Sequence, residues 1–351
     1  MVAANQTQPH SNESKHMSEN NLQVLFKSRP SGWVVPENFE LHEGTVPEPG
    51  DGDVLVRNRY MSVDPYMRNR MNDVKSYVEG FKLGKVLTGG VVGEVAKSNN
   101  PAFKEGDQVS GMLGWENYTN VPGGAGLMKV DGSLAPLSWY LGVLGMPGMT
   151  AHVGLLKIGQ PKEGETVYVS AASGAVGQIV GQIAKLKGCR VVGSAGSDEK
   201  VAFITEQCGF DAGFNYKKVD SLGETLRTHC PDGIDVYFEN VGGRMLEAVL
   251  NQMNPFGRVS ACGMISQYNL EKPEGVHTLL NVVGKRLRIE GFIVSDHFAE
   301  LPTFIQEMGG WLKNGDITYR EDVKEGLENA PAAFIGMLKG ENFGKQVVKI
   351  A

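Results

Sequence analysis

Cysteine is scarce in this sequence, which has four cysteines among 351 residues: Cys189, Cys208, Cys230 and Cys262. No two of them have C-x-x-C spacing, so the sequence offers neither a zinc ribbon nor a disulfide framework. The seven histidines show no metal-binding spacing either. We therefore expect no metal site. Four widely spaced cysteines without a disulfide framework also fit a reducing cytoplasm.

A basic excess is also missing. The 34 Lys and Arg residues are outnumbered by 40 Asp and Glu residues, which gives a formal net charge of −6, whereas a nucleic-acid-binding protein usually shows a basic balance or stripe. Residues 132–156 carry no acidic or basic side chain and could span a bilayer by length, but two prolines and five glycines interrupt them. Residues 1–21 are polar and lack the apolar core of a signal peptide, so we expect a disordered tail. These absences predict a cytoplasmic protein that binds neither nucleic acid nor a membrane.

Glycine is abundant, with 46 residues, and the chain has two textures. Residues 22–148 read as short strands cut by glycine and proline, such as 53–58 and 89–95, which is typical of a small β-barrel or curled sheet. From residue 149 strands alternate with helices, which predicts a parallel, doubly wound α/β sheet. The final apolar run, 346–350, could return to the first domain. We therefore expect a catalytic domain of residues 22–148 and 318–351, and a nucleotide-binding domain of residues 149–317.

The segment Ala171–Gly177 lies between a predicted strand, 166–170, and a predicted helix, 175–187. This is the position of the dinucleotide-binding pattern G-x-G-x-x-G, with Ala172 in the first glycine place and Gly174 and Gly177 in the second and third. Gly174 would let the backbone approach a pyrophosphate, and Gly177 would allow close packing of the helix. The phosphates would lie over the N-terminus of the helix, where unpaired N–H groups favour negative charge.

The next predicted strand ends at Val192-Gly193-Ser194-Ala195-Gly196-Ser197, without the Asp or Glu that would bind the ribose 2′-hydroxyl of NAD. Lys200 follows within one helical turn and can pair with a 2′-phosphate. NADPH is therefore favoured over NADH, although Lys200 could also be a solvated helix residue.

Several longer stretches resemble the zinc-independent branch of the medium-chain dehydrogenase/reductases. Within it the chain is most similar to prostaglandin reductases, plant alkenal double-bond reductases and bacterial curcumin reductases. The matching stretches are residues 62–68, 145–151, 162–177, 193–200, 214–216, 238–243, 262–269 and 291–295. The zinc-dependent branch has an early catalytic cysteine, whereas this chain has none before Cys189. The resemblance implies a Rossmann domain with a GroES-like β-barrel domain, and a homodimer.

The resemblance also implies which residues bind NADPH. Pyrophosphate contacts are expected from Ser173, Gly174, Ala175 and Val176, beside Gly177, and 2′-phosphate contacts from Lys200 and Tyr216. The nicotinamide end and the crevice would be formed by Asn240, Cys262, Gly263, Met264, Ile265, Ser266, Tyr268, Phe292, Ile293, Val294 and Asn342. A strand is predicted over residues 287–294, so an ordinary core strand is the alternative reading for Phe292 and Val294.

The implied reaction is reduction of the C=C bond of an enal or enone. Hydride addition at the β-carbon develops negative charge on the carbonyl oxygen, and a hydrogen-bond donor there stabilises the transition state. Tyr268 matches the tyrosine that this family uses, with packing on the cofactor alone as the alternative. Tyr66 and Tyr77 match substrate-facing positions, and for Tyr66 the alternative is a structural turn, Asp64-Pro65-Tyr66. Tyr60 and Trp115 are candidates only for the pocket wall, with core packing as the alternative. A zinc-free quinone oxidoreductase and a crystallin-like protein that binds the cofactor without catalysis remain alternatives, because the fold alone does not separate them.

Overall fold

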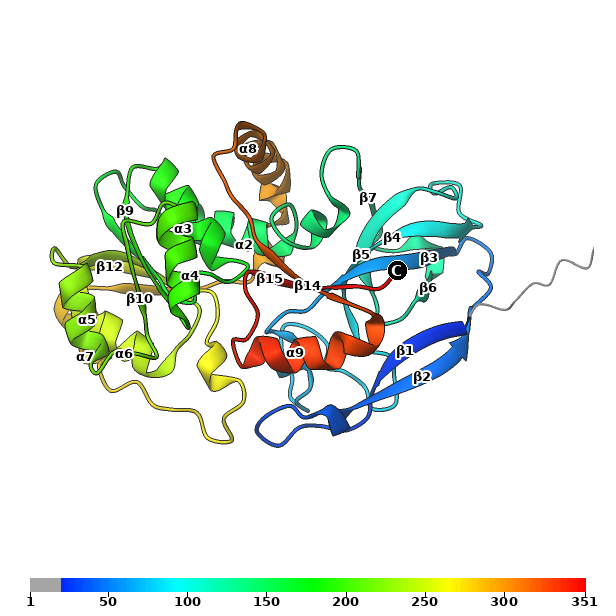
Figure 1. Cartoon of the computed structure of the whole chain (residues 1–351), viewed down its shortest axis with the longest axis horizontal. Coiled ribbons are helices and arrows are strands. Elements are labelled where there is room, and N and C mark those ends of the chain that lie inside the picture. Colours follow the sequence, from blue (N-terminus) through cyan, green and yellow to red (C-terminus); the bar gives the residue numbers. More distant parts are fainter. Residues whose placement is uncertain (1–19) are drawn as a thin grey trace, which may run out of the picture.

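The computed structural model describes residues 20–351, which form two sheet-centred parts joined through the middle of the molecule (Figure 1). The predicted disordered tail lies almost wholly outside the described residues. Its last two residues, Asn20 and Asn21, already belong to the first strand, β1 (Asn20–Phe26). That strand pairs antiparallel with β2 (Phe39–Thr45).

The first part is a curled sheet of seven strands in the order β14-β15-β3-β4-β5-β7, with β6 also paired to β3. Its strands are β3 (Val54–Ser62), β4 (Thr88–Ser98), β5 (Gln108–Gly114), β6 (Tyr118–Val121), β7 (Met128–Lys129), β14 (Glu321–Glu325) and β15 (Lys345–Lys349). Valines from β3, β4 and β5 form its core with Trp115 and Phe334, whose rings meet edge to face. Burial of Trp115 in this core shows that it is not part of a pocket wall.

The second part is a six-stranded sheet, parallel throughout, in the order β10-β9-β8-β11-β12-β13. Its strands are β8 (Thr166–Val169), β9 (Arg190–Ala195), β10 (Ala212–Asn215), β11 (Ile234–Glu239), β12 (Met253–Ala261) and β13 (Arg288–Gly291). The chain moves outward from β8 to β10 and then returns to the other side of β8 with β11. The predicted doubly wound sheet is thus confirmed, and its topological switch point lies between β8 and β11.

Helices cover this sheet and connect its strands (Figure 1). They are α2 (Met146–Val153), α3 (Gly177–Leu186), α4 (Asp198–Ala202), α5 (Leu222–His229), α6 (Gly243–Gln252), α7 (Leu280–Lys285) and α8 (Leu301–Asn314). In α3, Ile179, Val180 and Ile183 are fully buried, as their helical spacing predicts. The strand predicted up to Val294 ends earlier, at Gly291, because the chain turns into a helical segment from Val294.

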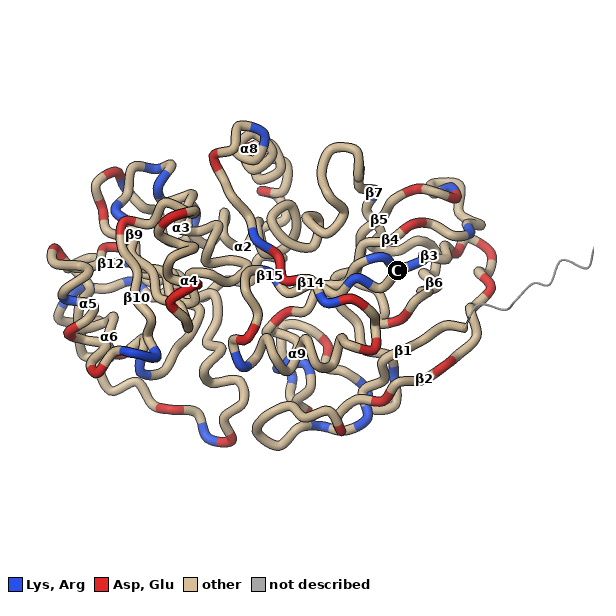
Figure 2. The backbone as a smooth tube through the Cα atoms, viewed as in Figure 1, with Lys and Arg blue, Asp and Glu red and all other residues tan. Residues whose placement is uncertain are grey.

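The end of the chain returns to the first part, as the apolar run 346–350 predicts. After α8 the chain forms β14, α9 (Ala330–Leu338) and β15, and β15 pairs antiparallel with β3. The remaining helix, α1 (Met67–Arg70), follows β3. Basic and acidic residues are interspersed along the backbone of both parts (Figure 2). Within residues 20–351, no helix combines the length and the apolar character needed to cross a membrane.

Candidate active site

The loop after β8 has the geometry of a phosphate-binding turn. Ala171 adopts a left-handed φ of 50°, and its carbonyl accepts the N–H of Gly174 at 3.0 Å. A Cβ at residue 177 would lie 2.5 Å from that same carbonyl oxygen, so only glycine fits there. A Cβ at Gly174 would meet only the Ala171 oxygen, at 3.2 Å, which leaves its other side open to a ligand.

Ala172 takes the first glycine place because the neighbouring strand makes room for it. A Cβ added at Gly193 of β9 would lie 2.7 Å from the Ala172 methyl group, so the glycine on the neighbouring strand leaves the space that this methyl group needs. The predicted residues Ser173, Ala175 and Val176 then lead into α3. At the start of this ten-residue helix the N–H groups of Gln178 and Ile179 already donate to the Gly174 and Val176 carbonyls, at 3.1 Å each. An anion would therefore be bound by the N–H groups of the loop before them, helped by the helix dipole.

Basic and hydroxyl groups converge at the end of β9, around Gly196. The Tyr216 hydroxyl and the Lys217 side chain would each lie 3.4 Å from a Cβ at Gly196. Lys200 lies close by, and burial together with the charge of Lys217 lowers the pKa of its ammonium group. Asp198 is turned away, since it binds Lys218 and the amide of Asn215 at 2.8 Å. Asp322 and Glu199 also act on Lys200, but more weakly than Lys217 does. Two neighbouring ammonium groups suit a phosphate dianion.

Lys217 was missed in the sequence, although it directly follows Tyr216. Sequence spacing alone does not show that the turn after β10 returns its side chain to the end of β9. The Lys200 ammonium group also donates to the carbonyl of Gly340 at 2.7 Å, which connects this corner to the loop before β15.

The predicted crevice would lie at the carboxyl ends of adjacent strands, where a doubly wound sheet binds ligands. Ser170 follows β8, Asn240 follows β11, and Cys262 follows β12. Asn240 is fixed here, because its amide donates to the Ser170 carbonyl at 2.8 Å and its N–H to the Ser170 hydroxyl at 3.0 Å. Burial and the nearby Glu239 raise the pKa of Cys262 to about 12, so its thiol stays protonated.

Tyr268 is placed by a tight turn after β12. Its hydroxyl accepts the backbone N–H of Met264 at 3.2 Å, and in residues 20–351 no group accepts its own proton. A Cβ at Gly263 would lie 3.1 Å from that hydroxyl, so glycine leaves the space that the hydroxyl occupies. Burial raises the Tyr268 pKa, and the nearby Cys262 and Tyr77 raise it further. The phenol is therefore a neutral donor with a free proton.

Of the other two predicted tyrosines, Tyr77 lies within electrostatic range of Tyr268 and Tyr66 lies within electrostatic range of Tyr77. Tyr77 is more than half exposed, and its pKa is raised by burial of its remaining surface and by Cys262. Tyr66 is partly buried beside Arg70, and burial, Asp64 and Tyr77 raise its pKa while Arg70 lowers it. Tyr77 thus lies within electrostatic range of both Tyr66 and Tyr268.

The remaining predicted residues lie around this crevice in different ways. Ile265 and Ser266 belong to the turn that carries Tyr268, and the Ser266 hydroxyl donates to the Val241 carbonyl at 2.6 Å. Phe292 packs edge to face on Phe238 and, like Val294, against the core of the second part. Ile293 separates them. The Asn342 amide donates to the Gly344 carbonyl at 2.8 Å, and Gly344 bridges to Gly174 of the phosphate loop.

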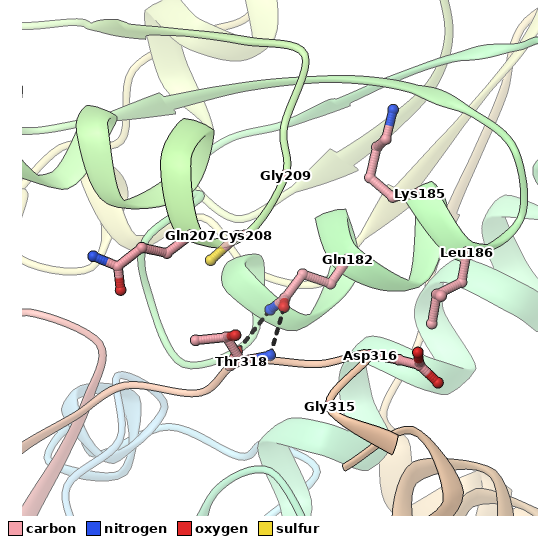
Figure 3. A pocket seen from close by; sticks show the side chains of 9 residues that line it. All are labelled: Gln182, Lys185, Leu186, Gln207, Cys208, Gly209, Gly315, Asp316 and Thr318. Atoms are coloured by element: carbon pink, nitrogen blue, oxygen red, sulfur yellow. Dashed lines mark hydrogen bonds between the residues drawn. The ribbon is translucent and has the colours of Figure 1, made fainter. Parts of the chain in front are cut away.

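Two cavities of about 300 Å³ each lie outside this crevice. One is formed by the end of α3, the turn before β10 and the segment after α8, and contains none of the predicted site residues (Figure 3). There the Gln182 amide makes two 2.7 Å hydrogen bonds to the Thr318 backbone, which tie α3 to the returning chain. The other cavity borders Asn342 beside α9. Within residues 20–351, no three His, Cys, Asp or Glu side chains cluster in a way that could hold a metal.

Two family models match the chain over well more than half its length. One, described as the N-terminal domain of oxidoreductase, matches residues 22–130, and the other, described as zinc-binding dehydrogenase, matches residues 175–309. The chain is 50% identical to 2-alkenal reductase (NADP(+)-dependent) of Nicotiana tabacum over 336 residues, which covers 94% of this chain and 98% of that protein. It is 49% identical to NADPH-dependent curcumin reductase of Escherichia coli over 339 residues, covering 95% and 98%.

A solved structure extends this likeness to three dimensions. The chain superposes on CurA from Vibrio vulnificus in complex with NADPH with a TM-score of 0.89 and 45% identity, covering 94% of this chain and 99% of that one. The likeness to these relatives in sequence and in fold extends over 94% of the chain. The chain belongs to the zinc-independent double-bond reductase family of the medium-chain dehydrogenases/reductases.

Proposed function

We propose that this protein is an NADPH-dependent reductase that acts on the C=C bond of α,β-unsaturated aldehydes and ketones. The observation that carries the proposal is the Tyr268 hydroxyl, which is held by the Met264 N–H and keeps its proton free beside the crevice. The relatives support it, since their names describe a 2-alkenal reductase that is NADP(+)-dependent and a curcumin reductase that is NADPH-dependent.

In the proposed mechanism, NADPH supplies the hydride for the β-carbon of the substrate when it is bound. Tyr268 donates a hydrogen bond to the carbonyl oxygen as negative charge develops there, which lowers the barrier because the donor is already in position. Tyr66 and Tyr77 form the facing wall and orient the substrate. The α-carbon then takes a proton from solvent or through the tyrosine hydroxyl.

The cofactor residues predicted from the sequence form one continuous path in this proposal. Ser173, Gly174, Ala175, Val176 and Gly177 bind the pyrophosphate, and Lys200 and Tyr216, with Lys217, bind the 2′-phosphate. The open side of Gly174 and the nearness of the Lys200 and Lys217 charges support these roles. The nicotinamide end is formed by Asn240, Cys262, Gly263, Met264, Ile265, Ser266, Tyr268, Phe292, Ile293, Val294 and Asn342.

A comparative substrate screen tests the proposed function. Oxidation of NADPH is followed at constant enzyme concentration with simple alkenals, aryl enones, keto-prostanoids and quinones. We expect steady turnover with enals and enones and formation of the saturated carbonyl product. Turnover confined to quinones would identify a quinone oxidoreductase, and tight NADPH binding without turnover would identify a crystallin-like binding protein. Either result would contradict the proposal.

A homodimer is also part of the proposal. β13 is the terminal strand of the parallel sheet, so one of its edges has no strand partner among the described residues. Apolar side chains are exposed nearby: Leu280 and Val283 on α7 are 82% and 74% exposed, and Ile289 on β13 is 38% exposed. An exposed apolar patch beside a free sheet edge suits a second copy of the chain. Sedimentation equilibrium should give twice the chain mass for the unaltered protein and a lower mass for Val283→Asp, whereas an unaltered protein at the monomer mass would contradict the dimer.

The proposal also includes the domain limits predicted from the sequence. The catalytic domain has residues 22–148 and 318–351, and the nucleotide-binding domain has residues 149–317. Strands of the seven-stranded sheet come from residues 54–129 and 321–349, and those of the parallel sheet from 166–291, which supports these limits. The four cysteines are free thiols, which supports a cytoplasmic location.

A further inference from the structure

Arg68 carries a buried charge that the proposed mechanism does not use. It follows Tyr66 by two residues, on α1, and it is only 4% exposed. In residues 20–351 no acidic side chain lies within ion-pair distance of it, and its burial lowers the pKa of the guanidinium group. Burying a cation without a carboxylate is costly, so this position has a function beyond ordinary packing.

Three neutral oxygen atoms surround the guanidinium group, two of them from distant parts of the chain. Nε donates to Asn269 Oδ1 at 3.0 Å, one Nη to Asn72 Oδ1 at 2.7 Å, and the other to the Gly32 carbonyl at 2.8 Å. Asn269 is itself only 5% exposed and directly follows Tyr268. The planar guanidinium fork therefore connects the helix next to Tyr66 with the turn that carries Tyr268.

A second contact runs alongside this connection. The Ser31 hydroxyl donates to Glu271 Oε1 at 3.3 Å, and a Cβ at Gly32 would lie 3.6 Å from the Asn269 carbonyl oxygen. In Figure 1 the yellow segment after β12 faces the blue loop between β1 and β2 at this place. The turn carrying Tyr268 therefore contacts the first part of the molecule through Asn269 and Glu271.

We propose that Arg68 is a positioning residue that fixes the distance between the Tyr268 turn and the Tyr66 helix through its bond to Asn269. This inference rests on the proposed function, because it assigns Arg68 a role in placing the tyrosine hydroxyls on either side of the substrate. Small displacements of a catalytic donor reduce turnover strongly even when the ligands still bind. Arg68 thus affects the transition state without touching substrate or cofactor.

The test compares Arg68→Gln, Asn269→Leu and Asn269→Asp, with Arg59→Gln as a matched control. Arg59 forms a partly exposed ion pair with Glu94 and has no contact with the crevice residues named above. We expect Arg68→Gln and Asn269→Leu each to lower kcat for an aryl enone by about tenfold, with the NADPH Kd within about twofold of the original. Asn269→Asp keeps an oxygen acceptor for Nε and should retain most of the activity. The double variant should be no slower than either single variant, since both remove the same contact.

Hydrogen–deuterium exchange of peptides covering residues 264–270 gives a readout that does not need turnover. Exchange there should be faster in Arg68→Gln and Asn269→Leu and unchanged in Asn269→Asp and Arg59→Gln. If the unaltered protein reduced no enone, the proposed function would fail while the exchange data still tested the connection. The proposal would be overturned if kcat stayed unchanged despite a lower Tm, or if Asn269→Asp lost as much activity as Asn269→Leu. If Arg68→Gln does not fold, the two Asn269 variants decide.

Discussion

Replacing Tyr268 with phenylalanine is expected to lower kcat for enone reduction by about a hundredfold, at the lower end of the effect typical for one oxyanion donor. The variant keeps the ring and its packing, and it removes only the hydroxyl that accepts the Met264 N–H and offers its proton to the substrate oxygen. That contact strengthens as charge develops, so its loss affects the transition state more than the bound substrate. The Kd for NADPH should change little.

A second variant moves the same hydroxyl without removing it. In Gly263→Ala the new methyl group would lie 3.1 Å from the Tyr268 hydroxyl, which must shift to relieve the contact. We expect a smaller fall in kcat than for Tyr268→Phe. Gly309→Ala on α8 is the matched control, because an added Cβ there meets nothing within 4 Å and it lies outside the site.

The pH profile gives an independent test of the same donor. Burial raises the Tyr268 pKa, so the hydroxyl keeps its proton at alkaline pH where an exposed tyrosine, with a pKa of about 10, would lose it. Activity should show no ionisation of this tyrosine up to that pH.

Two results for Tyr268→Phe would contradict the donor role. An unchanged kcat would make Tyr268 a packing residue, and the donor would then be sought at Tyr66 or Tyr77. A large loss of NADPH affinity would make it a binding residue instead.

The sequence predicted the parts of the fold that depend on short-range patterns. The apolar spacing of Ile179, Val180 and Ile183 predicted α3, and the strand–helix alternation predicted the parallel sheet. Parallel strands have their carboxyl ends at the same edge of the sheet, so the position of the cofactor site at that edge was also predictable, whereas the order of the strands was not. The strand expected up to Val294 was too long, because apolar residues such as Phe292 and Val294 pack on the core from outside a strand.

What the sequence could not predict depends on contacts between distant segments. Lys217 could not be recognised from the sequence as part of the proposed phosphate site, because only the turn after β10 brings it to Gly196. Trp115 was left open between a pocket wall and the core, and only its packing against Phe39 and Phe334 decides for the core. The bond from Arg68 to Asn269 joins residues 201 positions apart, and no local pattern marks it.

Replacing Lys200 with alanine is expected to weaken NADPH binding by about ten- to a hundredfold, and to leave NADH binding almost unchanged. A charge-assisted hydrogen bond contributes about 1.5–3 kcal/mol, and about 1.4 kcal/mol corresponds to tenfold in Kd. Only NADPH carries the 2′-phosphate, so the loss should appear as lost selectivity. Because burial and Lys217 lower the Lys200 pKa, NADPH affinity should also begin to fall at a lower pH than for an ordinary lysine.

Titration calorimetry with both cofactors measures the effect, and a neighbouring lysine provides the control. Lys218 is exposed and pairs with Asp198, so Lys218→Ala should keep both affinities. Lys217→Ala should weaken NADPH binding in the same direction as Lys200→Ala, since the Lys217 side chain lies at the Gly196 turn and its charge acts on Lys200. Lys200 also donates to the Gly340 carbonyl, and a role confined to that contact would weaken both cofactors equally. Equal losses for NADPH and NADH would therefore contradict the 2′-phosphate assignment and leave Lys200 as a structural link to the loop before β15.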